Sequence, residues 1–160
     1  MKELDAQAKN KKLGLTFKPA SNAQKIYVDP DKVREVILNL VDNAIKYTPK
    51  GKVELETYIK DKAFHFVIKD TGLGIRQSEV KSLFKKFVRG TGIAQVNTQG
   101  SGLGLYIAQR VVGEHGGKIW AESDGLEKGS TFHFYLPIIK ASDIAVINSA
   151  AAKSASAEKP

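Results

Sequence analysis

Four polar side chains recur on one stripe of a predicted helix that is otherwise apolar. Glu35, Asn39, Asn43 and Lys46 stand at i, i+4, i+8 and i+11, which is a single face of an α-helix. The positions between them already supply an apolar surface for a core, so the amides are not needed to make the helix soluble. The stripe therefore predicts a binding surface, and a magnesium-bound nucleotide is the best candidate for its ligand.

Two glycine clusters add to this prediction. Residues 70–75 read Asp-Thr-Gly-Leu-Gly-Ile, and residues 99–105 read Gln-Gly-Ser-Gly-Leu-Gly-Leu at the start of a predicted helix. Glycines let the backbone approach a ligand closely, and the free amides at a helix start favour phosphate oxygens. An ionised Asp70 only accepts hydrogen bonds, which suits the exocyclic amine of adenine but not the carbonyl of guanine. Neither the phosphate-binding loop ending in Gly-Lys-Ser/Thr nor the dinucleotide fingerprint occurs in the chain.

Length and composition limit the class of protein further. The chain has 160 residues, 42% of them hydrophobic, which is enough for one full core and favours a single domain. The absence of cysteine excludes a disulfide scaffold and suits a reducing compartment, so the cytoplasm is the default expectation. No stretch approaches the roughly 20 apolar residues of a membrane helix, which predicts a soluble chain. The net charge of +8 is compatible with nucleic acid, anionic lipid or polyphosphate, and charge alone does not choose among them.

Hydrophobic periodicity and turn residues predict strands that come in hairpins and helices that separate them. In chain order we expect an edge strand in 13–17, a strand at 25–28, a helix from 29–31 to about 47, paired strands in 53–57 and 64–68, a short helix from about 77 to 89, a loop at 90–100, a helix over 103–112 ended by Gly116-Gly117, and paired strands at 118–123 and 130–136. This order predicts an α+β fold, a two-layer sandwich in which about three helices pack on one side of a mixed, mostly antiparallel sheet. A doubly wound parallel fold is less favoured because the strands come in hairpins.

Composition divides the chain into three parts. Residues 1–24 are a polar N-terminal segment, partly an edge strand or linker, and residues 25–140 form the predicted domain. From residue 141 to 160 alanine, serine and lysine dominate, which predicts a low-complexity, disordered tail.

Five blocks of the sequence, in order, resemble the catalytic ATP-binding domain of bacterial sensor histidine kinases, within the wider gyrase, chaperone and mismatch-repair ATPase superfamily. The blocks resemble the N box, G1 box, F box, G2 box and last-strand motif of that family, and they lie at 39–48, 70–75, 83–89, 100–105 and 129–132. The resemblance runs from about residue 25 to 137, and it implies the Bergerat-type ATP-binding fold.

The resemblance also implies a role for each block. Asn43 would ligate Mg²⁺ with support from Asn39, and Lys46 and Arg89 would reach the phosphates, so that these four residues carry the catalytic role. Asp70 would accept a hydrogen bond from the adenine amine, helped by Thr131 through a water. The implied nucleotide contacts are Asn39, Asn43, Lys46, Tyr47, Asp70, Gly72, Gly74, Ile75, Phe87, Gly100, Ser101, Gly102, Leu103, Gly104, Leu105 and Thr131. Phe84 and Phe87 would anchor a lid over the site, although their helical spacing favours core packing over direct ligand contact.

The family resemblance implies transfer of the γ-phosphate of Mg-ATP to a histidine on a separate dimerisation domain, and from there to a response regulator. No such helix pair precedes residue 25, so we do not expect autophosphorylation from this chain alone. We expect no contact of this chain with nucleic acid or membrane, and any membrane anchor would belong to other parts of a parent protein. Two alternatives stay open. One is an ATP-hydrolysing clamp or chaperone of the same superfamily, which would need a carboxylate such as Glu35 as the base; the other is a basic nucleic-acid-binding module without catalysis.

Overall fold

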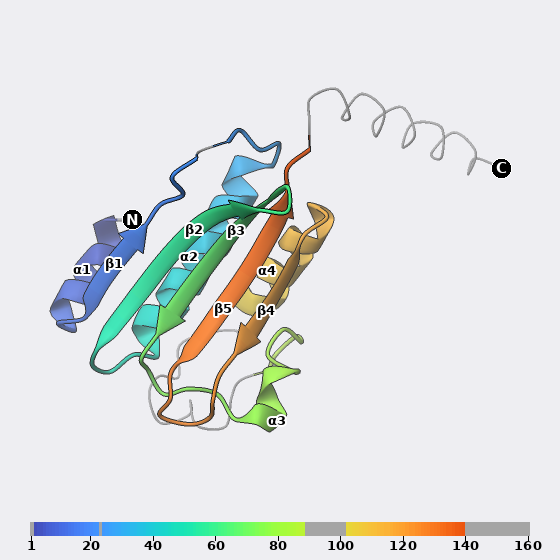
Figure 1. Cartoon of the computed structure of the whole chain (residues 1–160). Helices are drawn as coiled ribbons and strands as arrows, with labels where there is room; N and C mark the ends of the chain where they lie inside the picture. Colours follow the sequence, from blue (N-terminus) through green and yellow to red (C-terminus); the bar gives the residue numbers. More distant parts are fainter. Residues whose placement is uncertain (1, 23, 89–101, 140–160) are drawn as a thin grey trace.

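The computed structural model describes residues 2–22, 24–88 and 102–139. It contains nine helices and strands within those ranges, shown in Figure 1. They are α1 (Lys2–Asn10), β1 (Gly14–Lys18), α2 (Pro30–Lys46), β2 (Lys52–Lys60), β3 (Ala63–Asp70), α3 (Gln77–Val80), α4 (Gly104–Glu114), β4 (Lys118–Glu122) and β5 (Ser130–Pro137). No helix in these ranges is long and apolar enough to cross a bilayer.

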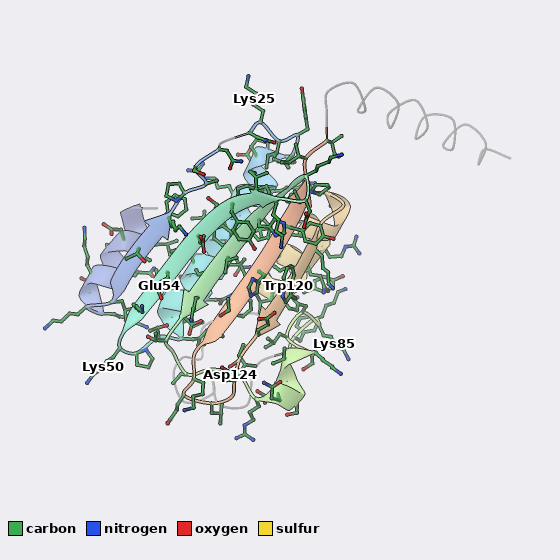
Figure 2. All side chains as sticks on the ribbon, viewed as in Figure 1. Lys25, Lys50, Glu54, Lys85, Trp120 and Asp124 are labelled. Atoms are coloured by element: carbon green, nitrogen blue, oxygen red, sulfur yellow. The ribbon has the colours of Figure 1, made fainter. Side chains whose placement is uncertain are left out.

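The strands form one five-stranded sheet in the order β1-β2-β3-β5-β4. All neighbours are antiparallel except β1, which runs parallel to β2 at the edge. The helices α2 and α4 lie side by side against one face of this sheet, and none of the described helices covers the other face (Figure 1). Glu54 and Trp120 project from that second face (Figure 2). This arrangement confirms the predicted α+β, two-layer class with a mixed, mostly antiparallel sheet.

The core lies between α2, α4 and the helix-facing side of the sheet. Alternate residues of the central strands point into it: Phe66 and Ile68 from β3, and Phe132, Phe134 and Leu136 from β5. The stripe of α2 that meets them is fully apolar and consists of Val33, Val36, Leu40, Val41, Ala44 and Ile45. Because each fully buried Leu or Phe contributes about 1.5–3 kcal/mol, these layers fix the position of α2 on the sheet.

The start of α2 is set by the residues predicted to open it. The Asp29 carboxylate accepts hydrogen bonds from the N–H groups of Asp31 and Lys32, both at 3.1 Å, and Pro30 occupies the first turn. The backbone N–H of Asp29 in turn donates to His115 Nε2 at 3.0 Å. His115 follows α4, so this bond ties the end of one helix to the start of the other.

The strand predicted at 25–28 does not form. Residues 24–27 have no regular structure, Tyr27 is 52% exposed, and Ile26 and Val28 pack against the border of the core instead. The edge of the sheet beside β2 is taken by β1, which is the edge strand predicted in 13–17. Apolar residues at 26 and 28 therefore gain burial without backbone pairing.

Two helices also differ from prediction. Of the helix predicted from about 77 to 89, only a single turn forms, which is α3. The buried Leu83 and Phe84 lie in the turns that follow it. The N-cap residue of α3, Arg76, makes no side-chain cap hydrogen bond with the described residues, so one source of helix stability is missing there. Conversely, α1 was not predicted, because most of its residues are polar. Its apolar face consists of one pair at i and i+4, Leu4 and Ala8, and both are buried in the common core.

Candidate functional site

Asp70 ends β3 and is the most deeply placed carboxylate among the described residues, with 4% of its surface exposed. Its Oδ1 accepts a hydrogen bond from the Gly72 N–H at 2.8 Å, and its Oδ2 accepts one from the Ser130 hydroxyl at 2.5 Å. Burial raises the pKa of Asp70 above its ordinary value, while the bonds from Ser130 and Gly72 act in the opposite direction. The carboxylate is therefore held in one orientation at the end of the sheet.

Ser130, and not Thr131, stands beside Asp70. The register of β3 and β5 pairs Asp70 with Ser130 and Lys69 with Thr131. Since paired residues share a face and successive residues alternate, Thr131 lies on the face of the sheet opposite to Asp70. The prediction that Thr131 helps Asp70 is therefore wrong by one residue. The alternation of Phe132, Phe134 and Leu136 toward the core was the signal that could have identified Ser130.

The turn after Asp70 packs directly on the end of α2. The N–H of Leu73 donates to the Tyr47 carbonyl at 3.0 Å. A Cβ atom on Gly72 would overlap that carbonyl oxygen and approach Asp70 Oδ1 to 2.8 Å, so only glycine fits at this position. The turn then continues through Gly74 to Ile75, which is buried and donates its N–H to Ser123 Oγ at 3.0 Å.

The same end of the sheet thus gathers the first glycine cluster and the last turn of α2. Lys50, which follows α2, and Asp124, between β4 and β5, mark this end in Figure 2. Lys46 and Tyr47 lie here together, with the Lys46 ammonium 5.4 Å from the centroid of the Tyr47 ring.

The amide stripe of α2 faces the start of α4. Asn39 and Asn43 are both half-buried, and Asn43 Nδ2 donates to Asn39 Oδ1 over a long 3.4 Å. A Cβ atom on Gly104 would come within 2.5 Å of Asn39 Nδ2 and 2.6 Å of Asn39 Oδ1. The backbone at the start of α4 therefore lies directly on the Asn39 amide, in a position that any larger residue would block.

The start of α4 carries the features of an anion site. No side chain within the described part of the chain caps its first N–H groups, and no acidic residue occupies its first turn. The helix dipole gives this end partial positive charge, which favours phosphate oxygens. Gly102 and Leu103 lead into this turn, and Leu105 within it packs against the core.

The two phenylalanines of the predicted lid anchor have different surroundings. Phe84 is buried and packs edge-on against Phe132 with ring centroids 6.5 Å apart, as core packing predicts. Phe87 is 73% exposed, so the core-packing interpretation is wrong for it. Its φ of +61° is a left-handed conformation, and its N–H donates to the Gly102 carbonyl at 3.2 Å. The remaining predicted contacts Arg89, Gly100 and Ser101 lie outside the described residues.

The sequence matches the family described as "Histidine kinase-, DNA gyrase B-, and HSP90-like ATPase" over residues 28–140. The chain belongs to this family, as a catalytic ATP-binding domain of the histidine kinase type. It is 38% identical over 142 residues to the adaptive-response sensory kinase SasA of Synechococcus sp. strain JA-2-3B'a(2-13), a match that covers 88% of this chain and 37% of the relative. It is also 36% identical over 116 residues to the sensor histidine kinase WalK of Bacillus subtilis, covering 70% of this chain and 19% of the relative.

Solved structures give the same result for the fold. The catalytic domain of histidine kinase ThkA superposes with a TM-score of 0.71 at 26% identity, over 86% of this chain and 90% of that one. Full-length ShkA, solved in complex with AMPPNP, superposes with a TM-score of 0.74 at 28% identity, over 88% of this chain and 28% of that one. The chain spans 30–37% of the length of three SasA relatives from Synechococcus.

Proposed function

We propose that this chain binds Mg-ATP between α2, α4 and the end of β3, and presents the γ-phosphate for transfer to a histidine on a separate dimerisation domain. One observation carries this proposal: a buried, oriented carboxylate lies beside the C-terminal end of α2, and an amide pair in the C-terminal half of the same helix lies against a helix start that no described side chain caps. Asp70 suits the exocyclic amine of adenine, and the start of α4 suits the phosphates. Tyr47 and Lys46 lie at the end of α2 that adjoins Asp70.

The amide pair fits a magnesium ion. Mg²⁺ prefers hard oxygen ligands and binds proteins through one or two of them, keeping waters and phosphates for its other positions. Among the described residues, Asn39 Oδ1 accepts only the long bond from Asn43, so it is weakly held there. Asn43 would hold the ion with support from Asn39, and the ion would neutralise charge on the transferred phosphoryl group. The protein itself contributes the positions of these amides.

Transfer to a partner is favoured over rapid ATP hydrolysis. An amide cannot act as a general base, and residue 39 is an amide. Glu35, the nearest carboxylate on the stripe, lies one helical turn further from Asn43 and is exposed. Phosphoryl transfer mainly requires positioning and charge neutralisation, and both are compatible with a phosphate acceptor that another domain supplies. The expected acceptor is a histidine of a dimerisation domain, with a response regulator as the later recipient.

Ligand titration tests the binding part of this proposal. We expect ATP with Mg²⁺ to raise the melting temperature and to give a measurable heat of binding, whereas GTP and a DNA duplex at equal concentration do neither. Stabilisation by the duplex alone would support the basic nucleic-acid module. Stabilisation by GTP equal to that by ATP would contradict the assignment of Asp70 to adenine.

Phosphotransfer tests the catalytic part. We expect radiolabel from γ-labelled ATP to appear on a sensor-kinase dimerisation domain linked to this chain, and to be lost when the acceptor histidine of that domain is replaced. Steady release of inorganic phosphate without any labelled protein would instead favour the hydrolysing clamp or chaperone.

A further inference from the structure

The end of α2 is fastened by three different parts of the chain. A helix leaves its last four carbonyl groups without partners inside the helix, which in α2 are those of residues 44–47. The Ala44 carbonyl accepts from the Thr48 hydroxyl at 2.6 Å, and the Tyr47 carbonyl accepts from the Leu73 N–H at 3.0 Å. The remaining two, of Ile45 and Lys46, both accept from a single ammonium group.

That group is Lys11, which lies 34 residues before Ile45 in the sequence. Its Nζ donates to the Ile45 carbonyl at 2.9 Å and to the Lys46 carbonyl at 2.8 Å. A cation at this place also meets the negative end of the α2 dipole. Partial burial lowers the pKa of Lys11, while the charge of Asp42 raises it and that of Lys46 lowers it.

The backbone around Lys11 is held as firmly as its side chain. The Lys11 N–H donates to the Gln7 carbonyl at 3.1 Å, and the Leu13 N–H donates to the Ala8 carbonyl at 2.9 Å. Both Ala8 and Leu13 are buried in the core, and β1, which follows, pairs with β2. The ammonium is therefore presented to α2 by a turn that is fixed at both ends.

We propose that Lys11 is a positioning residue of the nucleotide site, which holds the Lys46–Tyr47 backbone in the place where it meets ATP. This inference rests on the function proposed above. Lys11 touches no atom assigned to the nucleotide and lies outside the residues 28–140 that match the family. Because its bonds connect the α1–β1 segment to the last turn of α2, a displacement of that segment changes ATP affinity through Lys46 and Tyr47.

Lys11→Met tests this role against Lys12→Met in the whole 160-residue chain. Methionine keeps an apolar stem and removes the donor, and the Lys12 side chain makes no hydrogen bond or ion pair with the described residues. We expect Lys11→Met to weaken Mg-ATP binding about three- to tenfold by calorimetry, because two charge-assisted bonds are lost, and Lys12→Met to change it less than about twofold. Lys11→Arg should restore most of the affinity.

A double-mutant cycle separates positioning from general stability. If Lys11 acts by placing Lys46, then Lys11→Met should cost clearly less affinity on a Lys46→Met background than in the wild type. The inference would be overturned if Lys11→Met reduced Mg-ATP affinity by the same factor on both backgrounds, or if Lys11→Met and Lys12→Met bound Mg-ATP equally well. Should Lys11→Met fail to fold, Lys11→Gln takes its place in the same cycle.

Amide hydrogen exchange provides a readout that needs no ligand. We expect Lys11→Met to speed exchange at the Tyr47 and Leu73 amides, which donate to the carbonyl groups of Asn43 and Tyr47. Exchange at the amides of β5 should stay unchanged. Absence of Mg-ATP binding in the wild type would defeat the proposed function, whereas unchanged exchange at these two amides would defeat the present inference.

Discussion

The two ends of the proposed nucleotide site differ in how completely the protein satisfies its own polar groups. At the β3 end both oxygens of Asp70 are bonded within the chain, by Gly72 and Ser130, and the carboxylate is almost fully buried. At the α4 end the Asn39–Asn43 bond is 3.4 Å long, and no described side chain caps the helix start.

This difference indicates which side chains the protein orients by itself and which ones a ligand would have to orient. Asp70 is oriented before any ligand arrives, so a base that matches it loses little free energy in reorganisation. Within the described part of the chain, the two amides and the first N–H groups of α4 keep capacity for hydrogen bonds, which a metal ion and phosphates would fill. We therefore expect substitutions at the Asp70 end to change selectivity for the base, and substitutions at the α4 end to change dependence on Mg²⁺.

Asp70→Asn should have the largest effect on binding. An amide presents a donor where the adenine amine needs an acceptor, so we expect ATP affinity to fall about 100-fold or beyond detection by calorimetry. The melting temperature at neutral pH should not fall, because the substitution removes a buried charge. Undiminished ATP binding would contradict the assignment of Asp70 to the base.

Asn43→Ala should have the next largest effect, confined to conditions with metal. Loss of one ligand from the ion predicts about 10- to 30-fold weaker Mg-ATP binding, measured by calorimetry with and without EDTA. In EDTA the variant and the wild type should bind ATP equally. A loss of the same size without Mg²⁺ would show that Asn43 acts on the nucleotide directly.

Ser130→Ala should shift the titration of Asp70. The hydrogen bond from the Ser130 hydroxyl lowers the pKa of Asp70 against the effect of burial, so its removal should raise that pKa further. The carbon-13 shift of the Asp70 carboxyl group, followed against pH in both proteins, measures this directly.

The free energy of unfolding of the wild type and of Ser130→Ala should depend on pH through the same titration of Asp70. Since the folded-state pKa is raised, the contribution of protonated Asp70 to the free energy of unfolding is fully present below its unfolded pKa and is lost as pH rises through the folded pKa. In Ser130→Ala this loss should extend to higher pH. Identical titration curves would mean that the hydroxyl does not act on the carboxylate, whereas Thr131→Ala, on the other face, should leave the curve unchanged.

Phe87→Gly should have the smallest effect. Phe87 is exposed and adopts a φ of +61°, a conformation that costs ordinary residues about 1 kcal/mol and glycine nothing. We expect the free energy of unfolding in urea to stay within about 1 kcal/mol of the wild type, because relief of the left-handed conformation opposes the greater entropy of glycine in the unfolded chain. Phe84→Gly, the matched core change, should destabilise by several times as much. A large loss of stability in Phe87→Gly would show that the exposed ring is held by contacts outside the described residues.

Local patterns predicted the position of several motifs of the proposed site, because each of these patterns lies within one helix, strand or turn. The amide stripe on α2, the capped start of that helix at Asp29 and the glycine cluster after Asp70 all occur where the sequence indicates them. The fold class followed from the order of hairpins and helices. One error was the choice between two neighbouring residues, Ser130 and Thr131, as the partner of Asp70. The other was at residues 25–28, where a short apolar pattern predicted a strand that does not form.

The sequence by itself determined the chemistry available to this protein: two amides at helical spacing, a carboxylate before a glycine turn and a second glycine cluster at a helix start. Only the tertiary structure decided which groups meet. The register of β3 and β5 brings Ser130 to Asp70 across 60 residues, and the packing of α1 brings Lys11 to the end of α2. The physical reason is that periodicity reports the face on which a residue lies, whereas its partner depends on how separate elements align when they bury a common core.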